Sequence, residues 1–164
     1  MSNELAGRRI LVVDDDVEVC EALEGVLSPA VIDCANSYEA ARAKLENGQY
    51  DVVILDIMGV RGHDLLDLFG REFACIMLTG KALTPDSFRS AVGGHARLFL
   101  PKEELPYLDQ YVAEVLSADK DLWPWLLKRL DLKRWLGSSF SVTEMLELAR
   151  KVQACENDDE PPDD

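Results

Sequence analysis

Residues 52–62 read VVILDIMGVRG, four consecutive apolar residues that end at a single acid, Asp56. A β-branched run of this length is typical of a strand that is buried on both faces of a parallel sheet. A carboxylate is costly to bury without a partner, so such a run usually ends where the chain meets water or a ligand. We therefore expect Asp56 at the mouth of a buried strand.

Similar apolar runs alternate with helix-periodic stretches along the first two thirds of the chain. Strands are predicted at residues 9–13, 30–34, 51–55, 73–78 and 96–100. Apolar periodicity and cap residues predict helices near 16–28, 37–47, 63–70, 85–92 and 103–117. Five successive βα units predict an α/β protein with a parallel sheet. In open sheets of this kind, ligands bind beyond the carboxyl ends of the strands.

The composition narrows the class of protein. The chain has 164 residues, which suits one domain with a short extension, and a formal net charge of −14, which argues against binding to DNA or to an anionic membrane. No apolar run reaches the roughly 18 residues of a membrane span, so no membrane insertion is expected. The absence of a C-x-x-C pair and of an apolar signal core predicts a cytoplasmic protein with four reduced thiols, at Cys20, Cys34, Cys75 and Cys155.

Polar residues follow four of the five predicted strands. They are Asp14, Asp15 and Asp16 after the first strand, Asp56 after the third, Thr79 after the fourth and Lys102 after the fifth. Asp16 alone is explained more simply as a helix N-cap. Acids that converge from separate strands cannot all turn away from one another, so they predict a bound cation. Ligation by oxygen alone favours Mg²⁺.

A cation beside a carboxylate, a hydroxyl and an amine suits a phosphoryl group. The metal would contact one phosphoryl oxygen, the Thr79 hydroxyl a second, and the Lys102 ammonium the third. Asp56 then has the role of a nucleophile, because aspartyl phosphates form by attack of a carboxylate on phosphorus.

Four motifs together carry a family resemblance. ILVVDDD (10–16), DVVILDIMG (51–59), IMLTG (76–80) and LFLPK (98–102), in this order and spacing, resemble the receiver domain of two-component response regulators. The resemblance covers about residues 8–118. It implies a flavodoxin-like, doubly wound sheet of five parallel strands in the order 2-1-3-4-5, with a binding site where the strand order reverses.

The resemblance also implies a role for each site residue. Asp56 would accept the phosphoryl group, Mg²⁺ would be bound by Asp14, Asp15, Asp56 and the backbone carbonyl of Met58, and the switch and phosphoryl-binding residues would be Thr79, Lys102 and Phe99. The phosphoryl donor would be a sensor histidine kinase or a phosphotransfer protein, and the chain would signal rather than turn over a separate substrate. Val60, Asp64 and Gly80 replace the proline, glycine and alanine that relatives often carry, which affects the expected loop conformation.

Two other classes of function are open to these residues. Asp14 and Asp16 are similar to the nucleophile and general acid of haloacid-dehalogenase-type phosphatases, although this reading leaves Asp56 without a role. An interaction domain that works without phosphorylation is the second alternative. It would be favoured by the loss of a site residue, and none is missing.

The last 46 residues fall outside the resemblance. We predict a receiver domain at 1–118, a helical extension of two helices at 119–155 and a disordered acidic tail at 156–164. The extension is short for a DNA-binding output domain, so output through protein contacts is expected. Its three tryptophans need cover, either from the receiver's own surface or from a second copy in a homodimer, and they are Trp123, Trp125 and Trp135.

Overall fold

A computed structural model gives the fold of this chain. The structure describes residues 3–57, 60–80, 86, 90–91, 93–117, 122, 125–126, 143, 147 and 150. Its strands are β1 (Arg9–Val13), β2 (Val31–Ala35), β3 (Val52–Asp56), β4 (Cys75–Thr79) and β5 (Leu98–Pro101). Its helices are α1 (Val17–Val26), α2 (Tyr38–Asn47), α3 (Gly62–Phe69) and α5 (Leu108–Ser117), with short 3-10 helices η1 (Asn3–Leu5) and η2 (Lys102–Tyr107).

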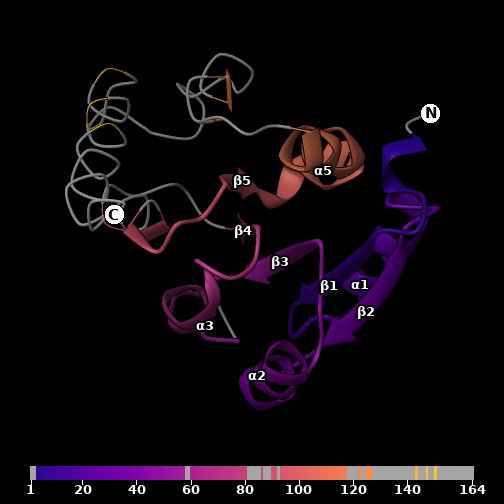
Figure 1. Ribbon diagram of the computed structural model, residues 1–164, viewed down its shortest axis with the longest axis horizontal. Coiled ribbons are helices and arrows are strands. Elements are labelled where there is room, and N and C mark those ends of the chain that lie inside the picture. Colours follow the sequence, from indigo (N-terminus) through magenta and orange to yellow (C-terminus); the bar gives the residue numbers. More distant parts are fainter. Residues whose placement is uncertain are drawn as a thin grey trace, which may run out of the picture.

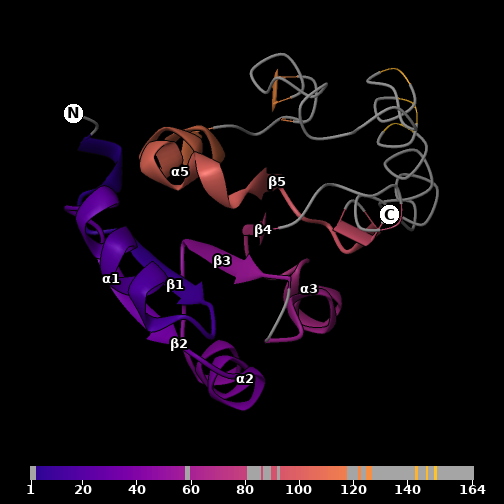
Figure 2. The ribbon, with the colours of Figure 1, turned by 180° about the vertical axis from the view of Figure 1, so that it is seen from behind.

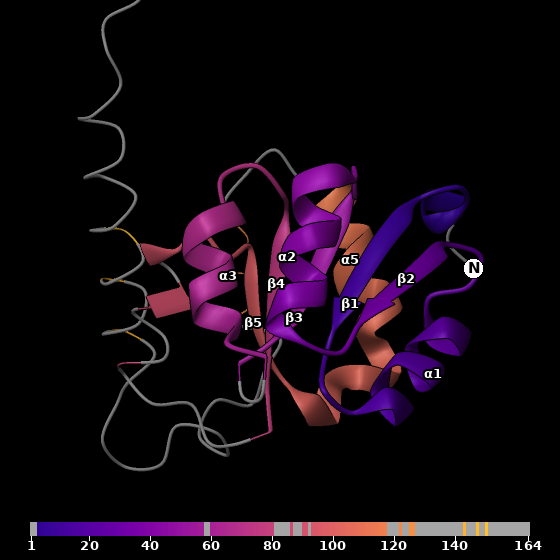
Figure 3. The ribbon, with the colours of Figure 1, turned by 90° about the horizontal axis from the view of Figure 1, so that it is seen from below.

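The five strands form one parallel sheet in the order β2-β1-β3-β4-β5. Helices α2 and α3 lie side by side on one face, and α1 and α5 cover the other (Figures 1, 2 and 3). The predicted α/β class and the strand order 2-1-3-4-5 are therefore confirmed.

Burial differs between the two edge strands of the sheet. Every residue of β3 and β4 is buried, as expected for strands covered on both faces, and so is every residue of the edge strand β5, whereas the other edge strand, β2, is only partly buried. The predicted strands differ from the observed ones by one or two residues at most boundaries. One of these shifts matters for function, because it makes Asp56 the last paired residue of β3, opposite Leu78.

Side-chain caps fix two of the helix starts. Asp16 accepts a hydrogen bond from the Glu18 amide at the start of α1, and Ser37 accepts one from the Ala40 amide at the start of α2. Gly48 follows α2. The N-cap role expected of Asp16 is confirmed.

The helix predicted at 103–117 is wrong in its first turns. The chain forms the 3-10 helix η2 over these residues and becomes α-helical only at Leu108. Pro106 lies inside this stretch, and a proline lacks the N–H that an α-helix needs there. The helix predicted at 85–92 lies mostly outside the described residues, of which Asp86, Ser90 and Ala91 are helical.

The beginning of the extension packs against α5. Leu122 and Leu126 are 2% and 1% exposed and belong to the hydrophobic core, and the Trp125 ring meets the Tyr111 ring edge-on at 5.8 Å. Trp123, Trp135, the proposed boundaries of the second extension helix and the acidic tail lie outside the described residues. Among the described residues, no helix is long and apolar enough to cross a membrane.

One expectation about the cysteines is wrong. Cys20 of α1 and Cys34 of β2 form a disulfide, with Cα atoms 6.3 Å apart, whereas four reduced thiols were expected. The sequence separation of 14 residues gave no motif for this pairing, which arises because α1 packs against the edge strand. Cys75 is a free thiol in the core, and burial raises its pKa to about 12.

Candidate functional site

The carboxyl edge of the sheet collects the polar residues that follow the strands. Asp14 follows β1, Asp56 ends β3, Thr79 ends β4 and Lys102 follows β5. Parallel strands bring these positions to one edge, as predicted. Asp14, Asp56 and Thr79 are only 4%, 3% and 5% exposed, which is unusual for side chains of this polarity.

Three of these side chains form an acidic group. Carboxylate oxygens of Asp14, Asp15 and Asp56 all lie within 4.8 Å of one another, with Asp15 exposed and the other two buried. Carboxylates this close repel one another unless a cation lies between or beside them.

Lys102 supplies part of that compensation. Its Nζ atom lies 2.9 Å from Asp14 Oδ2 and 3.4 Å from Asp56 Oδ1. Burial alone would lower the pKa of the ammonium group, but the contacts with Asp14 and Asp56 outweigh burial and raise it. Lys102 therefore remains positively charged at neutral pH and offsets part of the negative charge of the acidic group.

This charge balance fits a small divalent cation. Asp14 Oδ1 accepts a hydrogen bond from the Asp16 amide, whereas the buried Oδ2 has the ion pair with Lys102 and accepts no further hydrogen bond from the described residues. The group offers only oxygen atoms and carries an excess of negative charge, which are the properties that Mg²⁺ requires of its ligands. Met58, whose carbonyl was expected to join them, lies outside the described residues.

Asp16 does not belong to the acidic group. Its carboxylate caps α1 by accepting a hydrogen bond of 3.0 Å from the Glu18 amide. The general acid required by the phosphatase alternative is therefore committed to helix capping, while Asp56, which that alternative leaves without a role, lies in the group.

Thr79 ends β4, and Phe99 lies in the neighbouring strand β5. In the β4–β5 register Thr79 is opposite Pro101 and Met77 is opposite Phe99. The Phe99 ring is 2% exposed, so it already lies in the core in this structure. A Cβ atom on Gly80 would lie at an ordinary contact distance of 3.7 Å from the Lys102 side chain, which means that glycine is not required there for steric reasons.

Sequence reasoning missed the glycine that shapes the loop after Asp56. A Cβ atom on Gly62 would lie 2.1 Å from the backbone oxygen of Asp56, so only glycine fits. The expected glycine position was Asp64, two residues further along the chain. The available signal was Gly62 itself, which follows the strand that ends at Asp56 and directly precedes the helix predicted at 63–70.

Arg61 was also missed. It adopts the left-handed conformation (φ 54°) just before α3, its guanidinium carbon lies 4.3 Å from the centre of the Tyr38 ring, and its Nε lies 2.7 Å from Asp64. These contacts join the loop after Asp56 to the start of α2. A basic residue stacked on an aromatic residue 23 positions away leaves no local pattern in the sequence.

Comparisons with known proteins agree with this geometry. A scan against protein-family models matches residues 10–112 to the response regulator receiver domain, and the chain belongs to this family. A search of the curated proteins finds no match. The class of protein defined by the fold and the acidic site is therefore a receiver domain of two-component signalling.

Solved structures share the fold over about two thirds of the chain. TrrA, a response regulator protein from Thermotoga maritima in complex with Mg²⁺-BeF, is 30% identical, with 66% of this chain and 99% of that chain covered and a TM-score of 0.58. Another response regulator from Thermotoga maritima is 20% identical, with coverage of 68% and 99% and a TM-score of 0.61. The signal receiver domain of a putative LuxO repressor protein from Vibrio parahaemolyticus is 22% identical, with coverage of 68% and 91% and a TM-score of 0.61.

Proposed function

We propose that this chain is a response regulator that accepts a phosphoryl group on Asp56 from a sensor histidine kinase or a phosphotransfer protein. The observation that carries the proposal is the position of the Asp56 carboxylate, at the end of β3, within 4.8 Å of the Asp14 and Asp15 oxygens and 3.4 Å from Lys102. Membership of the receiver family and the Mg²⁺-BeF complex of TrrA support it.

The reaction requires few groups. An Asp56 oxygen attacks phosphorus, the bond from phosphorus to the donor's histidine nitrogen breaks, and its electron pair stays on that nitrogen. The Lys102 ammonium moves away from Asp14, its closer partner, and neutralises one phosphoryl oxygen. The Thr79 hydroxyl donates a hydrogen bond to a second phosphoryl oxygen. Asp14, Asp15, Asp56 and the Met58 carbonyl would hold Mg²⁺, which would neutralise charge on the transferred group.

The test is covalent and needs no kinase. Incubation with Mg²⁺ and phosphoramidate or acetyl phosphate should add the mass of one phosphoryl group to the wild type and none to Asp56→Asn. Asp51→Asn is the matched control, because Asp51 immediately precedes β3, at the end of the strand opposite to Asp56. Equal mass gain in Asp56→Asn, or full reaction after chelation of Mg²⁺, would contradict the proposal.

We also propose that residues 1–118 form the receiver, residues 119–155 a helical extension and residues 156–164 a disordered tail, with output through protein contacts. The packing of Trp125 on Tyr111 supports cover by α5, and a homodimer is the competing arrangement. Phosphorylation would reach the extension through Thr79 and Phe99, because charge added at Asp56 alters the packing beside β5.

Beryllofluoride with Mg²⁺ should therefore change the tryptophan fluorescence or the sedimentation coefficient of the whole chain. Phe99→Ala should weaken this response while Asp56 is still phosphorylated, and Phe99→Leu is the control for lost volume. Flat signals while Asp56 is demonstrably occupied would make the extension a fixed cap without a signalling role.

A further inference from the structure

Two cysteines and a glutamate meet between α1 and β2, away from the acidic group. Cys20 is 8% exposed, Cys34 is half-buried and Glu24 is exposed. The Sγ atoms of Cys20 and Cys34 and a carboxylate oxygen of Glu24 all lie within 4.8 Å of one another. Cys20 and Glu24 are four residues apart in α1, so they occupy the same face of the helix.

The face of β2 that points away from α1 makes other contacts, through Asp33. Asp33, next to Cys34, accepts hydrogen bonds from Lys44 of α2 and, at 2.7 Å, from the Tyr50 hydroxyl. Because side chains alternate along a strand, Cys34 points to the other face, toward α1. No basic residue lies in α1, which also carries Glu18 and Glu21, and Glu24 has no hydrogen bond or ion pair with any described residue. The local charge therefore favours a cation.

We propose that Cys20, Cys34 and Glu24 form a second metal site, selective for a thiophilic divalent cation such as Zn²⁺, that is open when the two cysteines are reduced and closed when they are joined as a disulfide. Two thiolates and one carboxylate supply three of the four ligands of a tetrahedral Zn²⁺ site, and water completes the set. The same ligands are a poor match for Mg²⁺, which prefers oxygen.

The two states interconvert by thiol–disulfide exchange. A dithiol reductant such as dithiothreitol supplies two electrons and two protons, becomes a cyclic disulfide and leaves Cys20 and Cys34 as thiols. Metal binding then releases those two protons to solvent, because the ligands are thiolates. Cys75 does not compete, since burial holds its thiol protonated with a pKa of about 12.

The site is tested by adding Co²⁺ to the full chain. A thiolate bound to Co²⁺ gives a charge-transfer absorption band, which Co²⁺ bound to the carboxylates of the acidic group does not give. Reduced protein should bind one Co²⁺ with this absorption band, oxidised protein none, and Zn²⁺ should displace Co²⁺ and abolish the band. Glu24→Gln should weaken Co²⁺ binding by at least about tenfold. Glu21→Gln, which makes the same change one residue after Cys20, should not.

Further variants separate this site from its alternatives. Cys34→Ser should lose the band while circular dichroism shows an intact fold, and Cys155→Ser should keep it. Asp56→Asn should also keep it, so failure of the phosphorylation proposal leaves this test unaffected. Reduced wild type without the band, or a band that persists in Cys34→Ser, would overturn the proposal.

Discussion

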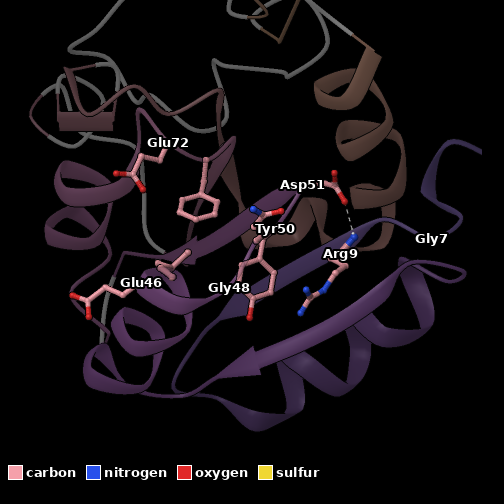
Figure 4. A pocket seen from close by; sticks show the side chains of 10 residues that line it. Gly7, Arg9, Glu46, Gly48, Tyr50, Asp51 and Glu72 are labelled. Atoms are coloured by element: carbon pink, nitrogen blue, oxygen red, sulfur yellow. Dashed lines mark hydrogen bonds between the residues drawn. The ribbon is translucent and has the colours of Figure 1, made fainter.

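The two ends of the same strands carry opposite kinds of charge arrangement. At the amino end lies a shallow pocket of about 620 Å³, in which Asp51 accepts a hydrogen bond of 2.8 Å from the Arg9 amide (Figure 4). The Arg9 guanidinium lies over the Tyr50 ring at 5.3 Å, and Arg8 pairs with Asp51 at 3.4 Å. At this end the Asp51 carboxylate is therefore paired with the Arg8 guanidinium and with the Arg9 amide.

The carboxyl end is unbalanced instead. The Lys102 ammonium contacts Asp14 and Asp56, and Asp15 adds a third carboxylate to the same group, although two of the three carboxylates are buried. A folded chain tolerates this cost where a bound ion or substrate offsets it. The two ends therefore differ in charge balance: Asp51 is paired at the amino end, whereas the carboxyl end, where we propose that Mg²⁺ and a phosphoryl group bind, carries an excess of negative charge among the described residues.

Removing one cationic side chain near each end should separate the two roles most strongly. Lys102→Ala should slow phosphorylation of Asp56 by about 100- to 1000-fold, because the ammonium stabilises charge on the transferred group. Arg9→Ala should leave the phosphorylation rate unchanged and affect only stability. Rates are measured by intact mass after addition of phosphoramidate and Mg²⁺. Similar rates in both variants would remove the distinction between the two ends.

A glycine substitution tests how rigidly the loop after Asp56 is constrained. Gly62→Ala should lower the free energy of unfolding by roughly 1–3 kcal/mol and slow phosphorylation, because the new Cβ atom would overlap the Asp56 carbonyl. Gly25→Ala, in open space within α1, should raise the unfolding free energy by about 0.5–1 kcal/mol. Urea denaturation gives both values. A stable, fully reactive Gly62→Ala would show that the loop adapts.

Neutralising one acid at each end should change stability in opposite directions. Without divalent cations, Asp15→Asn should raise the free energy of unfolding by up to about 1 kcal/mol, because repulsion within the acidic group falls. Asp51→Asn should lower it by roughly 0.5–1 kcal/mol through loss of the Arg8 pair. Added Mg²⁺ should stabilise the wild type more than Asp15→Asn, as thermal unfolding will measure. Destabilisation by both variants would contradict the charge imbalance.

An effect of similar size concerns pH at the amino end. Burial, reinforced by the hydrogen bond to Asp33, raises the pKa of Tyr50 from 10.0 to about 12. The folded state therefore holds this proton more tightly, so its contribution to stability is complete below pH 10 and is lost between pH 10 and about 12. Over this range the wild type should lose roughly 1 kcal/mol more than Tyr50→Phe, after allowance for solvent screening. If urea unfolding shows that the wild type and Tyr50→Phe lose the same free energy of unfolding over this pH range, this role for Tyr50 is excluded.

The acidic site could largely be predicted because it depends on topology. Once five apolar runs are assigned to a parallel sheet, residues after the strands share one edge, which brought Asp14, Asp56 and Thr79 together before any contact was known. The position of Lys102 at this edge was predictable, but its choice of partner was not, since its Nζ lies closer to Asp14 than to Asp56. That preference depends on side-chain conformation, which strand assignment does not determine.

The sequence alone determined the five strands, helices α1, α2 and α3, their order along the chain and the residue types at the carboxyl edge, because apolar periodicity and strand ends are local properties. Tertiary structure decided which distant residues meet: Gly62 against the Asp56 carbonyl, Arg61 on Tyr38, Trp125 on Tyr111 and Cys20 with Cys34. Such contacts depend on how helices are placed against the sheet. The packing of the whole core fixes that placement, and no local pattern encodes it.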